Sequence, residues 1–162
     1  MTRFIVASSL LTLSQAALAE EEGRPDFELA LTASPLLDLS LPFVPGVEVT
    51  SEWAAGQKFG VGFVGGVGSN LGVVWLGGLQ ANGYVLGDFS TGLLVGAEYD
   101  LHTLPSVGSL HSSTGIYVGG KYAFPFGLTL LVHGGAAWNF SKFDIGIGEV
   151  GPLVNAGLGW SF

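Results

Sequence analysis

Eight ionisable side chains could take part in acid–base or ion-pair chemistry, and most of them alternate with residues of apolar or glycine-rich runs. A period of two places such residues on one face of a β-strand. If that face lines a closed interior, each charge must be paired or protonated, because an unpaired buried charge is costly. We expect a structural polar network around Lys58 and Lys121, with a narrow proton or ion path as the alternative. The ionisable residues are Glu28, Glu48, Glu52, Lys58, Glu98, Asp100, Lys121 and His133, and the neutral Gln80, Asn139 and Asn155 fall in the same pattern.

Other sequence patterns give no support for a cofactor or a metal. The run from Gly60 to Gly65 fits G-x-G-x-x-G, but a dinucleotide site also needs a helix after the turn, and here the chain continues into another β-like run. Inward glycines are expected instead to make room for larger residues such as Tyr117 and Leu131. Asp100, His102 and His111 lack a recognised ligand spacing. We therefore expect neither metal nor cofactor.

The elements that position these residues are eight alternating segments, which predict eight β-strands. Short breaks at 54–57, 87–90 and 124–127 predict tight turns at one end. The connections at the other end are expected near 42–46, 69–70, 102–113 and 141–151, and they differ greatly in length. Pro35 interrupts the first segment, so we place it near a rim or a bulge. The segments run over about 27–41, 47–53, 58–67, 71–86, 92–100, 116–124, 128–140 and 153–162.

The first residues predict export. Met1–Arg3 is a positive start, an apolar run comes next, and Ala17-Leu18-Ala19 is a small-x-small cleavage site. This layout predicts a secretory signal peptide over 1–19 and one domain over 20–162. The chain has no cysteine for disulfides.

The composition predicts a membrane protein that crosses with strands. The chain is 48% hydrophobic and 11% charged, yet glycine and polar residues interrupt every apolar run after residue 19. A non-helical chain in a bilayer must close into a barrel, because every backbone polar group needs a partner there. We therefore predict an all-β fold, an eight-stranded antiparallel transmembrane up-and-down barrel. Aromatic residues near strand ends fit the girdles of such a barrel, and the net charge of −8 argues against nucleic acid as a partner.

The last strand carries the most specific family signal. Its alternating Leu158, Trp160 and terminal Phe162 resemble the C-terminal signal of bacterial outer-membrane barrels, which the barrel assembly machinery reads. With the other segments, the chain resembles the small eight-stranded class of OmpX-like proteins and the transmembrane domain of the OmpA family. That resemblance implies a monomer in a Gram-negative outer membrane, in contact with lipid and lipopolysaccharide.

The function expected of such a barrel is structural or surface-interaction, with a filled interior because eight strands enclose little more than their own side chains. Two rivals stay open. His111-Ser112-Ser113 resembles the His-x-Ser element of outer-membrane lipid A deacylases, but the acidic residue expected about a dozen positions later is missing. A narrow channel for ions or small solutes is the second rival, and the non-enzymatic role is the one we favour.

Overall fold

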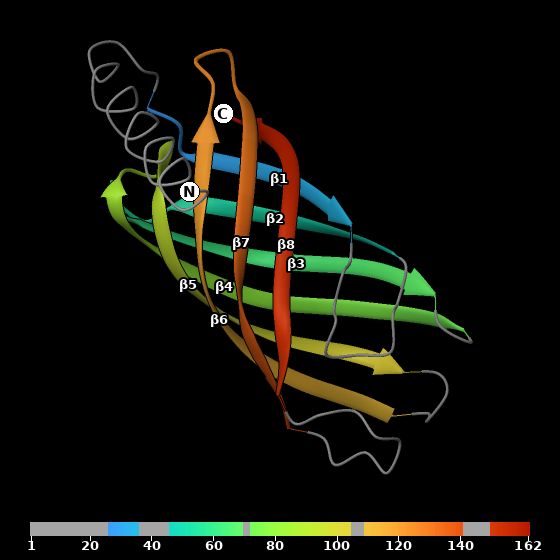
Figure 1. The fold of residues 1–162 in the computed structure, drawn as a ribbon. Helices are drawn as coiled ribbons and strands as arrows, with labels where there is room; N and C mark the ends of the chain where they lie inside the picture. The colour runs from blue at the N-terminus through green and yellow to red at the C-terminus, as the bar shows by residue number, and fades with distance from the viewer. Residues whose placement is uncertain (1–25, 36–45, 70–71, 105–108, 141–149) are drawn as a thin grey trace, which may run out of the picture.

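The computed structural model describes residues 26–35, 46–69, 72–104, 109–140 and 150–162, which form a closed antiparallel β-barrel (Figure 1). The predicted all-β, eight-stranded barrel is therefore confirmed. The predicted signal peptide, residues 1–19, lies outside the described residues. Neighbouring strands pair in chain order, and β8 returns to β1. The strands are β1 Leu29–Pro35, β2 Gly46–Ala54, β3 Phe59–Ser69, β4 Val73–Gly87, β5 Thr91–Leu104, β6 Ser109–Ala123, β7 Leu128–Asn139 and β8 Val150–Ser161.

The strands have the predicted alternation, with apolar side chains on the outer wall and small or polar ones inside. In β6, Ile116 and Val118 are exposed, whereas Tyr117 and Lys121 are buried. This arrangement results from the pleat of a β-strand, which points successive side chains to opposite faces. The described residues include no helix long and apolar enough to cross a membrane.

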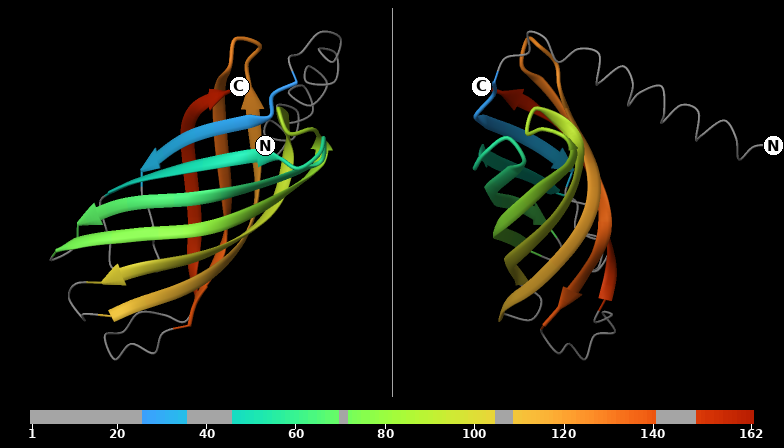
Figure 2. Two further views of the ribbon diagram at one scale, coloured as in Figure 1. Left: turned by 180° about the vertical axis from the view of Figure 1, so that it is seen from behind. Right: turned by 90° about the vertical axis from the view of Figure 1, so that its left-hand side faces the viewer.

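Three short turns lie at one end of the barrel, which we call the turn end (Figure 2). They join β2 to β3, β4 to β5 and β6 to β7, at the three breaks predicted from the sequence. Gly87 and Gly127 have φ angles of 75° and 104°, a region that strongly favours glycine. The carboxylate of Asp88 accepts hydrogen bonds from the Ser90 and Thr91 amides at 2.8 and 2.9 Å. The C-terminus is also at this end, since the Ser161 amide donates to the Gly127 carbonyl at 2.7 Å.

The opposite end, which we call the loop end, corrects one prediction. We expected a connection over 102–113, but β5 and β6 stay paired as far as Leu104 and Ser109. His102 and His111 are therefore cross-strand partners within the wall. Both histidines fall on the inward face of the alternation and are buried. Pro35 is the last described residue of β1 and pairs with Val47 of β2. The predicted connections near 42–46, 69–70 and 141–151 lie largely outside the described residues.

Aromatic and aliphatic side chains pack inside the barrel toward the turn end. The buried members of this cluster are Ala30, Tyr84, Phe89, Leu94, Tyr117 and Leu131. Glycine makes the room that these rings need in a narrow barrel. A Cβ on Gly96 would collide with the Tyr117 ring and the Asn82 side chain. For Tyr117, the expectation that inward glycines accommodate larger residues agrees with the structure.

Candidate functional site

Toward the turn end, the barrel interior contains a hydrogen-bonded ion pair. Lys121 of β6 donates from Nζ to Glu52 Oε2 of β2 at 2.9 Å, and their side chains are only 1% and 4% exposed. The other carboxylate oxygen, Oε1, accepts from Asn82 Nδ2 and Tyr84 Oη of β4, both at 2.8 Å. We call these four residues together with Tyr117 the ion-pair layer. Three bonds to one carboxylate offset much of the desolvation cost of burying it.

Aromatic rings enclose the ion-pair layer. Tyr117 Oη donates to Asn82 Oδ1 at 2.8 Å, which fixes the amide that bonds Glu52. Lys121 Nζ lies 3.4 Å from the centroid of the Phe89 ring, within the range of a cation–π interaction. Lys121 therefore contacts both the Glu52 carboxylate and the Phe89 ring. The ion-pair layer is therefore a connected network in which Glu52, Asn82, Tyr84, Tyr117 and Lys121 all have hydrogen-bond partners.

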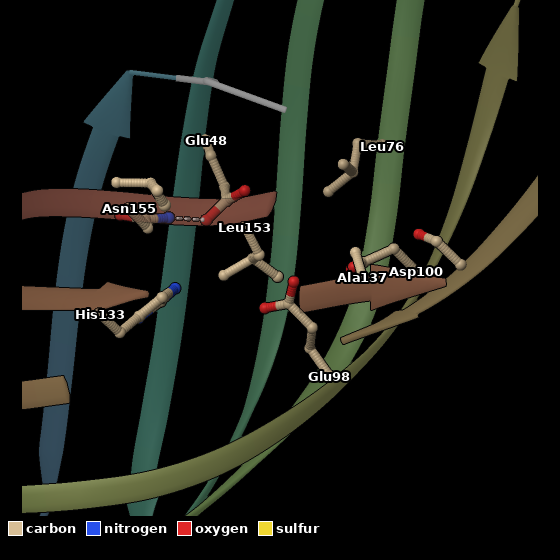
Figure 3. Close-up of a pocket in the computed structure, with 10 residues that line it drawn as sticks. Glu48, Leu76, Glu98, Asp100, His133, Ala137, Leu153 and Asn155 are labelled. Atoms are coloured by element: carbon tan, nitrogen blue, oxygen red, sulfur yellow. Dashed lines mark hydrogen bonds between the residues drawn. The ribbon is translucent and has the colours of Figure 1, made fainter. Parts of the chain in front are cut away.

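On the loop-end side of this layer the interior contains a cavity of about 40 Å³ (Figure 3). Three of its lining residues are acidic: Glu48 from β2, and Glu98 and Asp100 from β5. Asn155 of β8 donates from Nδ2 to Glu48 Oε1 at 2.8 Å and so links two strands that are not neighbours. Among the described residues, no lysine or arginine lines this carboxylate cavity. Its lining is Glu48, Leu76, Glu98, Asp100, Ser113, His133, Ala137, Leu153, Val154 and Asn155.

His133 connects the two regions. Its ring stacks on Tyr117 with centroids 4.2 Å apart and planes at 17°, so one face contacts the ion-pair layer. The residue is only 5% exposed, and it lines the carboxylate cavity, with its ring drawn toward the acidic residues in Figure 3. The buried Nε2 has no hydrogen-bond partner among the described residues, and neither does Asn155 Oδ1. Both atoms are therefore buried polar groups whose hydrogen-bonding capacity is not met by the described residues.

The predicted polar residues divide between these two groups, with two exceptions. Glu52 and Lys121 meet in the ion-pair layer, while Glu48, Glu98, Asp100 and His133 line the carboxylate cavity. Glu28 and Lys58 are exposed at the turn end rather than inside. Glu28 precedes β1, and Lys58 lies in the turn before β3, where its Nζ donates to the Gly87 carbonyl. Both residues stand at positions that the alternation assigns to the inward face. They lie just outside β1 and β3, however, and are therefore not buried in the barrel.

Sequence reasoning missed several residues of the interior. Asn82 and Tyr84, both in the ion-pair layer, continue the inward phase that Gln80 begins, so extending the fourth segment's alternation would have found them. Phe89 belongs to a tight turn, and no periodic signal predicts that its ring folds back into the barrel. Ser113 was assigned to a loop, but it is buried and lines the carboxylate cavity.

The outer wall is the other candidate functional surface. It is covered with exposed aliphatic and aromatic side chains on every strand, among them Leu31, Val49, Phe63, Trp75, Val95, Val118, Val132 and Leu158. At the turn end, aromatic rings form a contiguous group, in which Phe124 lies 4.8 Å from Tyr122 and 5.4 Å from Phe126 between ring centroids. Phe126 lies 6.1 Å from Trp160 of the predicted C-terminal signal. A surface this apolar needs a nonaqueous neighbour or another molecule to cover it.

Comparison with known proteins gives no family assignment. No protein-family model matches the chain, and no curated protein or solved structure matches it either. The features that bear on function are therefore the barrel itself, its interior and its outer wall.

Proposed function

We propose that the protein is an integral β-barrel of a Gram-negative outer membrane with a structural or surface-interaction role. The observation that carries this proposal is the inverted distribution of side chains. Polar and ionised groups are buried inside, whereas aliphatic and aromatic groups are exposed outside on all eight strands. A water-soluble barrel has the opposite preference for its outer face. In lipid the same outer face needs no further partner, and the closed strands satisfy the backbone.

The aromatic residues support the orientation of the barrel in the membrane. The cluster of Tyr122, Phe124, Phe126 and Trp160 at the turn end fits the water–lipid interface, where amphipathic rings collect. Phe140 is exposed near the loop end and fits the second interface. Short turns are typical of the periplasmic side, so the loop end would face outward and meet lipopolysaccharide and surface partners.

The packing of the interior favours a structural role over a solute channel. Glu52 and Lys121 meet inside the barrel toward the turn end, and Phe89, Leu94 and Tyr117 are buried there as well. An eight-stranded barrel is only wide enough for its interior to fill with side chains. A continuous water path would require this packed region to open.

The geometry also weighs against an enzyme that acts on lipid A. A lipid substrate approaches the outer wall, but His111 and Ser113 occupy inward positions and are both 7% exposed or less. Ser113 lines the carboxylate cavity, where the wall separates it from lipid. The His-x-Ser spacing is explained by an inward face that repeats every second residue.

The first experiment compares the outer-membrane fraction with and without boiling on a detergent gel. A closed lipid-embedded barrel stays folded unboiled, runs as a compact band, and shifts to its chain mass after heating. Recovery in the soluble periplasmic fraction would contradict the proposal.

A pair of variants tests the lipid-facing wall directly. Val118→Arg places a charge on an outer-wall side chain that is 64% exposed, in the middle of β6. In lipid this change costs about 2–4 kcal/mol, whereas in water an exposed valine tolerates it. Val118→Leu is the matched control and keeps the apolar contact. Urea unfolding in lipid vesicles should separate the two variants, and equal stabilities would contradict a lipid-facing Val118.

A further inference from the structure

The seam between the first and the last strand is the shortest ladder of the described barrel. β1 and β8 pair over four residues, 30–33 with 158–161, whereas every other pair of neighbouring strands is joined over seven to 14 residues. Figures 1 and 2 show β1 and β8 meeting near the C-terminus and diverging toward the loop end. β8 stays paired with β7 as far as Val150. Over 150–157, the other edge of β8 therefore has no strand partner among the described residues.

Two prolines face this seam. Leu29 and Phe162 exchange backbone hydrogen bonds across it, at 3.3 Å from the Leu29 amide and 2.8 Å from the Phe162 amide. Alternate residues of a strand turn their backbone groups to the same neighbour, so Pro35 of β1 and Pro152 of β8 also turn theirs to the seam. Proline has no N–H, so neither residue can donate a ladder hydrogen bond there. The β1–β8 ladder is therefore weakened chemically as well as short.

A side-chain hydrogen bond crosses the seam where the ladder has ended. Asn155 of β8 donates from Nδ2 to Glu48 Oε1 of β2 at 2.8 Å, and so reaches across β1 (Figure 3). Glu48 stands beside Ser34 in the β1–β2 register, one residue beyond the last β1 residue that pairs with β8. We call the hydrogen bond between Glu48 and Asn155 the latch, because it joins the two sides of the seam.

The carboxylate cavity reaches the edge of β8 at the same place. Its lining includes Leu153 and Asn155, which are inward positions of β8, and also Val154, which is 48% exposed on the outer wall. Successive residues of a strand point to opposite faces, so a cavity that contacts both faces lies at the edge of that strand. Backbone groups without a strand partner are tolerated at membrane depth where they line a water-filled cavity, and the 40 Å³ volume has room for about three waters.

We propose that the β1–β8 seam is a side opening of the barrel, which the latch between Glu48 and Asn155 holds shut. When the latch breaks, β1 and β8 separate toward the loop end, and the carboxylate cavity opens to the outer wall. The hydrogen bonds of the ion-pair layer join β2, β4 and β6 and keep the rest of the barrel closed. The opening admits water and solutes of similar size. This inference goes beyond the proposed function and does not rest on it, because the seam opens to the outer wall whatever surrounds that wall.

The first measurement is amide hydrogen exchange, followed by NMR on the folded protein in detergent micelles. Adjacent residues of β8 provide the matched comparison, because Leu158 and Trp160 face β1 whereas Gly157 and Gly159 face β7. Each amide is expressed as a protection factor, which removes the intrinsic effect of its neighbours. We expect the two amides that face β1 to be at least about tenfold less protected, since a short ladder opens locally before the barrel unfolds.

Variants of the latch test what holds the seam shut. Asn155→Ala removes one hydrogen bond, so it should lower the protection of Leu158 about threefold to tenfold and leave Gly159 unchanged. Glu48→Gln keeps an acceptor oxygen and should stay close to the wild type.

A disulfide provides the opposite change. The chain has no cysteine of its own, and a Cβ on Gly157 would lie 3.6 Å from the Cβ of Ser34, which suits a disulfide. The double variant Ser34→Cys with Gly157→Cys should gain protection at Leu158 when it is oxidised and lose it again when it is reduced.

Thiol labelling then tests access from the outer wall. The reagent is a maleimide attached to an acyl chain, which stays in the micelle. Val154→Cys points outward and should react at the same rate with or without the latch. Leu153→Cys points into the cavity, and Asn155→Ala should raise its rate of reaction about threefold to tenfold.

Three results would overturn the side opening. They are equal protection on the two sides of β8, no effect of Asn155→Ala at Leu158, or a Leu153→Cys variant that never reacts although Val154→Cys does. The heat-dependent gel shift shows whether each variant is folded, so an open seam is not confused with a lost barrel. Should Asn155→Ala fail to fold, Glu48→Ala breaks the same latch from the other side.

Discussion

The two halves of the barrel interior treat buried charge in different ways. Toward the turn end, Glu52 and Lys121 form a pair in which the carboxylate accepts three hydrogen bonds and the ammonium contacts an aromatic ring. Toward the loop end, three carboxylates and His133 surround a cavity, and a buried nitrogen and a buried amide oxygen have no hydrogen-bond partner among the described residues. The polar groups of the ion-pair layer are paired with one another, whereas the carboxylate cavity is lined by residues with unsatisfied buried polar atoms. Satisfied and unsatisfied buried polar groups are thus separated along the barrel axis.

Breaking the ion pair should give the largest effect of any single change in the interior. Glu52→Ala removes the countercharge of Lys121 and two further hydrogen-bond acceptor contacts, so the lysine remains buried and unpaired. We expect a loss of about 3–5 kcal/mol in the free energy of unfolding. Urea unfolding of the protein in lipid vesicles measures it. A loss below about 1 kcal/mol would mean that water enters and solvates Lys121.

A double variant separates the cost of broken pairing from the value of the pair. Glu52→Leu with Lys121→Met replaces both charges by apolar groups of similar length. Such replacements are often neutral, so the double variant should be more stable than Glu52→Ala. Both variants lose the hydrogen bonds from Asn82 and Tyr84 to Glu52, so a double variant less stable than Glu52→Ala would mean that the two apolar side chains do not pack in the space of the ion pair.

Overpacking the interior should give the next largest effect. Gly96→Ala places a methyl group against the Tyr117 ring and Asn82, both held in the ion-pair layer, and we expect a loss of about 1–3 kcal/mol. Gly77→Ala is the control, because its Cβ would meet nothing within 4 Å on the outer wall. Equal unfolding midpoints for the two variants would show that Tyr117 moves aside without cost.

The sequence predicted the barrel well because every strand of a closed β-barrel has the same alternation of inward and outward side chains. Successive residues face the outer wall and the interior in turn, so the eight segments and the three short turns could be located from periodicity and glycine. The rule fails at strand ends, where it assigned Glu28 and Lys58 to the interior and His111 to a loop. It also cannot pair distant residues. Glu52 and Lys121 were both expected inside, but only the register around the barrel shows that they meet.

The partition of the interior into two regions was beyond sequence reasoning for a further reason. The position of an inward side chain along the barrel axis depends on strand tilt and register. The alternation of inward and outward residues gives neither of them. Asp100 and Lys121 have the same phase, yet one lines the carboxylate cavity and the other lies in the ion-pair layer. Phe89 lies in a turn, where no alternation predicts the direction of its side chain. Its ring nevertheless contacts Lys121 inside the barrel.

A smaller effect is expected for polar contacts around the carboxylate cavity. Asn155→Ala removes the 2.8 Å hydrogen bond to Glu48, in a half-buried region with room for water to replace the amide. We expect a loss of about 0.5–1.5 kcal/mol, well below that of Glu52→Ala. Urea unfolding under the same conditions gives the comparison. A loss as large as that of Glu52→Ala would mean that the cavity region is as tightly coupled as the ion-pair layer.

The smallest effect is expected for the two charges that sequence reasoning placed inside the barrel. Lys58 is exposed at the turn end, where water can replace its contact with the Gly87 carbonyl, so Lys58→Ala should change the free energy of unfolding by less than about 0.5 kcal/mol. Glu28→Gln should be equally mild. Lys121→Ala, which truncates the lysine of the same predicted network that the structure buries, is the matched contrast and should cost several kcal/mol. If Lys58→Ala and Lys121→Ala are equally damaging, Lys58 contributes to the interior after all, and the ion-pair layer is not the sole electrostatic centre of the described barrel.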